Sequence, residues 1–261
     1  MALETTIDVA GRPAGFMVGR RGPRGRPLVL FLHGSGGSAR TWLPQVSPLD
    51  REFGTAALDL PGRGRTPGPP LTDVWPMGAF AVAAARALQP EYPPVLAGIS
   101  LGGAAALAAA LQSPETWSGL ILVSTGARLH PHPQLLSVLR QDYAAGLTLF
   151  AELLHGAEGE PELVRRSRAV LAECPAATLL ADLEASSKFD VEDRLGEISL
   201  PALVLAGAAD RLAPPALSRR LAEGLAASRL TVFENVGHAP NLERHREVNI
   251  EIIDFVRDIF P

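Results

Sequence analysis

The sequence predicts an α/β fold in which a mostly parallel, twisted sheet is flanked by helices and interrupted by a helical insertion. Two observations lead to this prediction. Short, continuously apolar runs alternate along the chain with helical stretches, which is typical of a parallel sheet whose strands are buried on both faces. The alternation then stops between residues 127 and 195, where leucines recur at helical spacing and no strand is indicated.

Length, composition and charge limit what the chain can be. Its 261 residues, 47% of them hydrophobic, are enough for one domain with a substantial core. A net charge of −4 gives no electrostatic reason to expect a nucleic-acid partner or an acidic membrane surface. No apolar run approaches the roughly 18–20 residues of a membrane span, and the start of the chain lacks the pattern of a signal peptide. With the single cysteine, Cys174, these features predict a cytoplasmic protein without an internal disulfide.

The predicted elements follow one another in a regular order. An antiparallel hairpin is expected at residues 4–9 and 14–19, because Gly11 and Pro13 form a turn between two strand-like stretches. The parallel strands that follow are runs of four or five apolar residues, at 28–32, 55–58, 94–97, 120–123, 202–206 and 230–233. Helices are expected at 77–88, 104–111, 215–226 and 241–259 and, in the insertion, at 134–140, 143–155, 162–173 and 176–186. The sequence therefore predicts a core of residues 1–126 and 196–261 and a helical cap of residues 127–195.

A sharp turn around Ser100 is the motif on which the functional prediction depends. The residues Gly98-Ile-Ser-Leu-Gly102 follow a buried strand and precede a helix, which is the pattern Gly-x-Ser-x-Gly of a nucleophile elbow. The two glycines allow the strand and the helix to approach closely. The serine hydroxyl then lies at a helix N-terminus, where backbone N–H groups and the helix dipole favour developing negative charge.

A glycine-rich loop, His33-Gly-Ser-Gly-Gly-Ser38, follows the apolar strand at 28–32. It matches neither Gly-x-Gly-x-x-Gly nor a phosphate loop ending in Gly-Lys-Ser/Thr, so nucleotide binding is not indicated. Its position favours an oxyanion hole built from two backbone N–H groups, those of Leu101 and Ser35. Gly34 and Gly36 are the alternatives to Ser35. His33 is expected to brace the loop rather than to transfer protons.

Two further side chains follow later strands of the sheet. Asp210 comes after the strand at 202–206, and His238 comes after the strand at 230–233. Ligands gather at the carboxyl ends of parallel strands, and Ser100 lies at such an end as well. The order Ser, Asp, His is that of a nucleophile, its charge partner and its base. We therefore expect Ser100, Asp210 and His238 to form a catalytic triad, although a helix cap for Asp210 and a structural histidine remain the alternatives.

Other polar residues point to structure rather than chemistry. Asp59, which follows the strand at 55–58, is expected to hold its own turn by side-chain hydrogen bonds, with a second catalytic carboxylate as the alternative. His130 and His132 flank a proline without a third ligand nearby, and they are interpreted as loop residues. The sequence therefore predicts no metal and no cofactor. The leucines of the insertion are expected to form the cap's own core, with an acyl pocket as the alternative.

These motifs together resemble the α/β-hydrolase superfamily over nearly the whole chain. The matching segments are the His-Gly loop at 33–38, Asp-Leu-Pro-Gly-x-Gly at 59–64, Gly-x-Ser-x-Gly-Gly at 98–103, Gly-x-x-Asp at 207–210 and Gly-His at 237–238. Within the superfamily the chain is similar to the small capped carboxylesterases, including the pimeloyl-carrier-protein methyl ester esterases. Serine at position 100 is unlike the haloalkane dehalogenases and epoxide hydrolases, which carry aspartate there.

The resemblance implies a cofactor-free serine hydrolase that cleaves small-molecule carboxylic esters of short to medium acyl chain. The same triad could instead serve lactone, thioester, perhydrolysis or carbon–carbon bond chemistry, and some superfamily members with an intact triad act as small-molecule receptors. Ile99 stands where the carbon–carbon bond hydrolases usually carry asparagine, which makes that chemistry less favoured. The sequence leaves the physiological substrate and the oligomeric state open.

Overall fold

A single eight-stranded sheet forms the centre of the computed structural model, which describes residues 2–22, 25–156 and 160–261. The strand order is β1-β2-β4-β3-β5-β6-β7-β8. β1 and β2 form the antiparallel hairpin, β2 pairs antiparallel with β4, and β3 to β8 are parallel. The bounds of the strands are β1 (Leu3–Val9), β2 (Arg12–Val18), β3 (Leu28–Leu32), β4 (Gly54–Leu58), β5 (Val95–Ile99), β6 (Gly119–Val123), β7 (Ala202–Gly207) and β8 (Ser228–Phe233).

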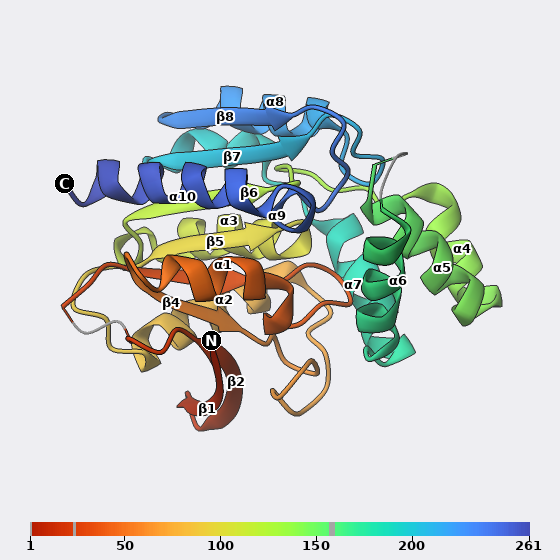
Figure 1. Ribbon diagram of the computed structural model, residues 1–261, viewed down its shortest axis with the longest axis horizontal. Helices are drawn as coiled ribbons and strands as arrows, with labels where there is room; N and C mark the ends of the chain where they lie inside the picture. The colour runs from red at the N-terminus through yellow and green to blue at the C-terminus, as the bar shows by residue number, and fades with distance from the viewer. Residues whose placement is uncertain (1, 23–24, 157–159) are drawn as a thin grey trace.

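Helices connect the parallel strands and cover both faces of the sheet (Figure 1). The connecting helices are α1 (Leu43–Leu49), α2 (Val74–Ala87), α3 (Leu101–Gln112) and α8 (Pro215–Gly224), and α9 (Pro240–Glu243) and α10 (His245–Ile259) follow the last strand. Short 3-10 helices lie at η1 (Ala39–Trp42), η2 (Pro114–Thr116) and η3 (Glu192–Glu197). The predicted α/β fold with a mostly parallel sheet is therefore confirmed, and the predicted strands differ from the observed ones by at most two residues at either end.

Two differences from the predicted helices have local causes. Ser38 is expected to cap the next helix, but it precedes the short 3-10 helix η1 without a side-chain cap hydrogen bond, and α1 begins only at Leu43, with Pro44 in its first turn, where a helix makes no use of the missing N–H. The last predicted helix is divided into α9 and α10. Arg244 separates them with non-helical backbone angles, φ −127° and ψ 40°.

The core lies in two layers, one on each face of the sheet. Successive residues of a strand point to opposite faces, so Leu30 and Leu96 pack with α2, α3 and α8 on one side. Phe31 and Ala97 pack with α1 and α10 on the other. Both layers are apolar, which explains why each central strand is continuously hydrophobic rather than alternating.

Four helices lie together beyond the carboxyl ends of β5, β7 and β8, at the right of the view (Figure 1). They are α4 (Pro133–Gln141), α5 (Tyr143–Leu154), α6 (Pro161–Ala172) and α7 (Ala176–Lys188), and we call them the helical insertion. Their buried leucines and Phe150 form a separate apolar cluster, as expected for a core of their own. None of the helices in the described ranges is both long and apolar enough to cross a membrane.

α3 lies unusually close to β5 and β3. A Cβ atom on Gly98 would overlap the carbonyl oxygen of Gly102 and lie 2.6 Å from the amide nitrogen of Gly103. A Cβ atom on Gly102 would overlap the carbonyl of Leu32 and lie 2.6 Å from that of His33. The atoms in the way belong to the backbone, so they cannot move aside as a flexible side chain would. Only glycine at both positions permits this packing.

We expect Gly98→Ala to lower the free energy of unfolding by about 2–3 kcal/mol, because the added methyl group pushes α3 away from β5. The measurement is urea unfolding followed by far-ultraviolet circular dichroism. Gly196→Ala is the matched control, because a Cβ atom there meets nothing within 4 Å, and it should change stability by less than about 0.5 kcal/mol. Equal stability of the two variants would contradict the close packing of α3 and β5.

Candidate active site

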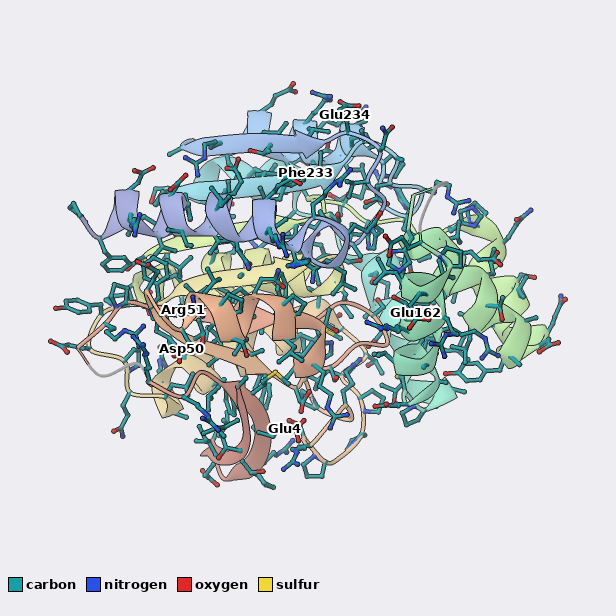
Figure 2. The ribbon with its side chains drawn as sticks, in the orientation of Figure 1. Glu4, Asp50, Arg51, Glu162, Phe233 and Glu234 are labelled. Carbon is teal, nitrogen blue, oxygen red and sulfur yellow. The ribbon has the colours of Figure 1, made fainter. Side chains whose placement is uncertain are left out.

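The loops that carry Ser100, Asp210 and His238 leave the same edge of the sheet. Backbone hydrogen bonds continue across the strand ends, from Ser100 N to Val123 O (2.9 Å), from Ser124 N to Leu205 O (2.8 Å) and from Ala208 N to Phe233 O (2.9 Å). Figure 2 marks Phe233 and Glu234, where β8 ends and the loop to His238 begins. The helical insertion, marked by Glu162, lies beyond this edge (Figure 2).

Ser100 occupies the turn between β5 and α3. Its backbone angles are φ 54° and ψ −118°, in a region that residues with a side chain rarely adopt. The strain is held in place by its surroundings, since Ser100 N–H donates to Val123 and the Thr125 hydroxyl donates to the Ser100 carbonyl over 2.9 Å. The half-buried serine therefore has the sharp turn that the Gly-x-Ser-x-Gly pattern predicts.

Asp210 and His238 lie in direct contact. His238 Nδ1 is 2.8 Å from Asp210 Oδ2, and both residues are buried. The other carboxylate oxygen accepts the N–H groups of Leu212 and Ala213, at 2.8 and 2.9 Å. Asp210 therefore holds its own turn and the imidazole together. An Nδ1–H donated to the carboxylate leaves the lone pair on Nε2, the nitrogen that a general base would use.

The serine is not hydrogen-bonded to this pair. Within the described residues, no hydrogen bond joins the Ser100 hydroxyl to His238, so the structure brings two of the three predicted residues into contact and places the third at the same sheet edge. In ligand-free enzymes such hydrogen bonds are often long and tighten only when substrate is bound. The assignment of Ser100 as the nucleophile thus stays a prediction.

Residues 33–38, which we call the oxyanion loop after the role that the sequence predicts for them, lie next to Ser100. A Cβ atom on Gly34 would be 3.4 Å from the Cβ of Ser100. The Gly36 N–H donates to Asp182 Oδ2 over 2.9 Å and is therefore not free for a substrate. This leaves Gly34 and Ser35 as candidates in the loop. Leu101 is the first residue of α3, where an N–H has no partner within the helix.

His33 and Asp59 hold the loops of this region, as predicted. His33 is fully buried, lies 2.9 Å from the Gly34 carbonyl through Nδ1, and accepts the Leu60 N–H at Nε2 over 3.1 Å. Burial and, after it, the Arg63 guanidinium lower the pKa of His33 from 6.5 to about 3, so the ring is neutral. Asp59 accepts the N–H groups of Ala39 and Arg65, and burial raises the pKa of its carboxyl.

A buried ion pair that sequence reasoning missed links the helical insertion to the core. Arg63 and Asp182 are in direct contact, and their side chains are 1% and 0% exposed. Burial lowers the pKa of Arg63 to about 10, which leaves the guanidinium charged at neutral pH. The available signal was a charged residue on the apolar face of α7, since Asp182 lies one turn after Leu179, which is buried.

Glu243 forms a second link between the helical insertion and the core, close to His238 in the chain, and sequence reasoning missed it as well. Its carboxylate accepts the Gly237 N–H over 3.1 Å and lies 3.4 Å from His155 Nδ1. The His238 N–H donates to the carbonyl of Leu154, at the end of α5, over 2.8 Å. The backbone that presents His238 is thus attached to the helical insertion on one side and to α9 on the other.

A cavity of about 340 Å³ lies beside the oxyanion loop. It is lined by residues 36–40 of the loop and η1, by Arg63 and by Cys174, among others. Ser100, Asp210 and His238 are not among its lining residues. This cavity therefore does not identify where a substrate would meet the serine.

We expect His33 to make the folded protein less stable as pH falls. The unfolded chain binds a proton on this ring below pH 6.5, whereas the folded protein does not until about pH 3, so stability rises with pH between these values. His33→Gln should make the slope of unfolding free energy against pH shallower, by up to about 1.4 kcal/mol per pH unit. Urea unfolding between about pH 4.5 and 6.5 measures the slopes. Parallel slopes for the two proteins would show that His33 is not held neutral.

The sequence matches a family model and several curated proteins. The model of the alpha/beta hydrolase family covers residues 29–251. A putative carbamate hydrolase RutD of Agrobacterium fabrum is 31% identical over 243 residues, which cover 88% of this chain and 93% of that protein. A pimeloyl-[acyl-carrier protein] methyl ester esterase of Neisseria meningitidis serogroup B is 30% identical over 243 residues, 87% of this chain and 92% of that protein.

Solved structures share the fold over almost the full length. A thermophilic esterase superimposes with a TM-score of 0.86 at 28% identity and covers 99% of both chains. The enol-lactonase from Burkholderia xenovorans LB400 gives a TM-score of 0.87 at 23% identity, over 97% of this chain and 100% of that one, a likeness of fold alone. Together with the family model, these matches show that the chain belongs to the alpha/beta hydrolase family.

Proposed function

We propose that this chain is a serine hydrolase that cleaves small-molecule carboxylic esters of short to medium acyl chain. The observation that carries the proposal is the contact between His238 Nδ1 and Asp210 Oδ2, at the sheet edge where the strained turn presents Ser100. This arrangement supplies a base whose proton-accepting nitrogen is free and whose charged form is stabilised by a buried carboxylate. Without such a base, a serine hydroxyl is a poor nucleophile.

The reaction would proceed through an acyl-enzyme. His238 Nε2 takes the proton of Ser100 as the hydroxyl oxygen attacks the ester carbonyl carbon. The imidazolium, stabilised by Asp210, then gives its proton to the leaving alcohol as the carbon–oxygen bond breaks. A water molecule, deprotonated by His238, attacks the acyl group in the second half, and the proton returns to Ser100 as the acid leaves.

The tetrahedral intermediates require an oxyanion hole, which we assign to the backbone N–H groups of Leu101 and Ser35. Leu101 follows the nucleophile at the start of α3, where the helix dipole also favours a negative charge. Ser35 is preferred to Gly36, whose N–H is already bonded to Asp182. Losing one such donor typically lowers turnover by about 100- to 1000-fold.

We further propose that residues 127–195 act as a cap over a core of residues 1–126 and 196–261. The supporting observations are that α4 to α7 lie beyond the carboxyl ends of the strands (Figure 1) and that the Leu154 carbonyl accepts the His238 N–H. A cap in this place would exclude water and select the acyl group. A cytoplasmic location agrees with the single cysteine, Cys174, which is buried and not in a disulfide.

Carbamate hydrolysis is a second candidate function, because one relative that is 31% identical is named a putative carbamate hydrolase. Lactones, thioesters, peracid formation and carbon–carbon cleavage also remain within reach of the same site, since each involves attack on, or release from, a carbonyl carbon. The pimeloyl-[acyl-carrier protein] methyl ester esterases among the relatives favour a simple ester.

Ser100→Ala is expected to keep the fold and to abolish ester hydrolysis, because no other hydroxyl occupies the turn. Wild-type and variant turnover of p-nitrophenyl butyrate are compared, with circular dichroism as the control for folding. Labelling by a fluorophosphonate should reach one group per wild-type chain and none in the variant. A variant within about tenfold of the wild-type rate would overturn the assignment of the nucleophile.

The substrate class is tested by a panel of carbonyl compounds of matched acyl length. We expect kcat/KM for p-nitrophenyl esters of four to eight carbons to exceed that for γ-lactones, acyl thioesters and aryl carbamates by at least about tenfold. A preference for one of the other classes would replace the ester with that class. Stoichiometric release of p-nitrophenol without further turnover would instead favour a small-molecule receptor.

A further inference from the structure

We propose that Asp182, on α7 of the helical insertion, is a positioning residue for the oxyanion hole. It acts through the Gly36 N–H of the oxyanion loop, and Arg63 is its counterion. The inference rests on the proposed function of Ser100. It goes beyond that function because it assigns a role in catalysis to a residue of the insertion that does not reach the reacting atoms.

The Asp182 carboxylate accepts two hydrogen bonds and makes one further ion contact, and its pair with Arg63 carries no net charge. Asp182 Oδ2 accepts the Gly36 N–H over 2.9 Å and the Arg63 Nε–H over 3.1 Å, while Oδ1 contacts the Arg63 Nη2. Arg63 Nη1 donates to the Pro61 carbonyl over 2.5 Å, which fixes the guanidinium in its own loop. A carboxylate without a counterion would repel the negative charge that develops on a nearby oxyanion. Asp182 can therefore hold the oxyanion loop only because Arg63 neutralises its charge.

One peptide group lies on each side of Ser35, and each is held by hydrogen bonds to one of its own atoms. The Gly34 carbonyl, in the same planar peptide as the Ser35 N–H, accepts from Gly37 N over 3.1 Å and lies 2.9 Å from His33 Nδ1. The next peptide is held at its N–H by Asp182. The direction of the Ser35 N–H is therefore constrained on both sides of the residue, and the second constraint comes from the helical insertion.

Gly36 is also the point at which the insertion packs on the loop. Its φ of 69° is a conformation that favours glycine, and a Cβ atom there would be 2.9 Å from Leu179 and 3.0 Å from Leu171. Both leucines belong to the apolar cluster of the insertion. Packing brings the insertion to the loop, and the Asp182 hydrogen bond fixes the orientation of the peptide.

Two double variants separate positioning from simple stability. Arg63→Met with Asp182→Leu removes both charges and leaves the Gly36 N–H without an acceptor. Arg63→Gln with Asp182→Asn also removes both charges, but it keeps an amide oxygen that can accept the Gly36 N–H. Neither variant strands a buried charge, and the two differ in the hydrogen bond to Gly36 and in the polarity of residue 63, whose arginine donates to the Pro61 carbonyl in the wild type. If the apolar pair does not fold, Arg63→Gln with Asp182→Ala takes its place as the variant without an acceptor.

We expect the variant without an acceptor to lose about 10- to 100-fold in kcat with less than about a threefold change in KM, because the oxyanion hole acts mainly on the transition state. The variant that keeps an acceptor should stay within about threefold of the wild-type kcat. Inhibition by a butylboronic acid, whose serine adduct places an oxygen in the oxyanion hole, should weaken in parallel with kcat. Equal kcat and equal inhibition in the two double variants would overturn the proposal.

Glu184→Gln is the matched control on the same helix. It breaks an exposed ion pair with Arg140 inside the insertion and should leave both kcat and boronate inhibition unchanged. Hydrogen exchange of the Gly36 amide gives a readout that needs no catalysis, and it should be slow in the wild type and faster only in the variant without an acceptor. Activity in Ser100→Ala would overturn the proposed function, whereas unaltered kcat despite fast Gly36 exchange would overturn the positioning role alone.

Discussion

The close approach of α3 to the ends of β5 and β3 is the constraint on which the site depends. Gly98 and Gly102 let backbone meet backbone there, so the turn at Ser100 has no room to relax. The same contact places the start of α3 against the carbonyls of Leu32 and His33, where the oxyanion loop begins. The serine and the loop that would receive the oxyanion are therefore set relative to each other by one packing contact, before any side chain is considered. This is how a strained conformation can persist in a stable protein.

The sequence was sufficient for features that depend on neighbouring residues. The strands at 28–32 and 120–123 are apolar throughout because both faces are covered, and that pattern is visible without coordinates. The elbow at Ser100 and the loops at Asp210 and His238 were placed at one edge because parallel strands share a direction. The Asp210–His238 contact follows from this topology, since 28 residues suffice for one helix and one strand between the two side chains.

The features that were missed depend on residues far apart in the chain. Arg63 and Asp182 are separated by 119 positions, and Gly36 and Asp182 by 146. Nothing local marks Arg63 as buried, because its neighbours Gly62 and Gly64 are typical of an exposed turn. Glu243, which contacts Gly237 from only six positions away, is the last residue of α9, directly before the break at Arg244. The sequence predicts a single helix at 241–259 across this break.

The helical insertion touches the site through the backbone of two loops rather than through a lining of side chains alone. Leu154 accepts the N–H of His238, and Asp182 accepts that of Gly36, so the proposed base and the oxyanion loop each have an anchor in the insertion. Each anchor orients a peptide group, and the orientation of peptide groups governs how well charge is stabilised in the transition state. On the proposed function, we therefore expect a sequence change in the insertion to alter kcat as well as the choice of substrate. Under the cap function and the positioning role that we propose, the same helices determine both selectivity and rate, so the two are coupled.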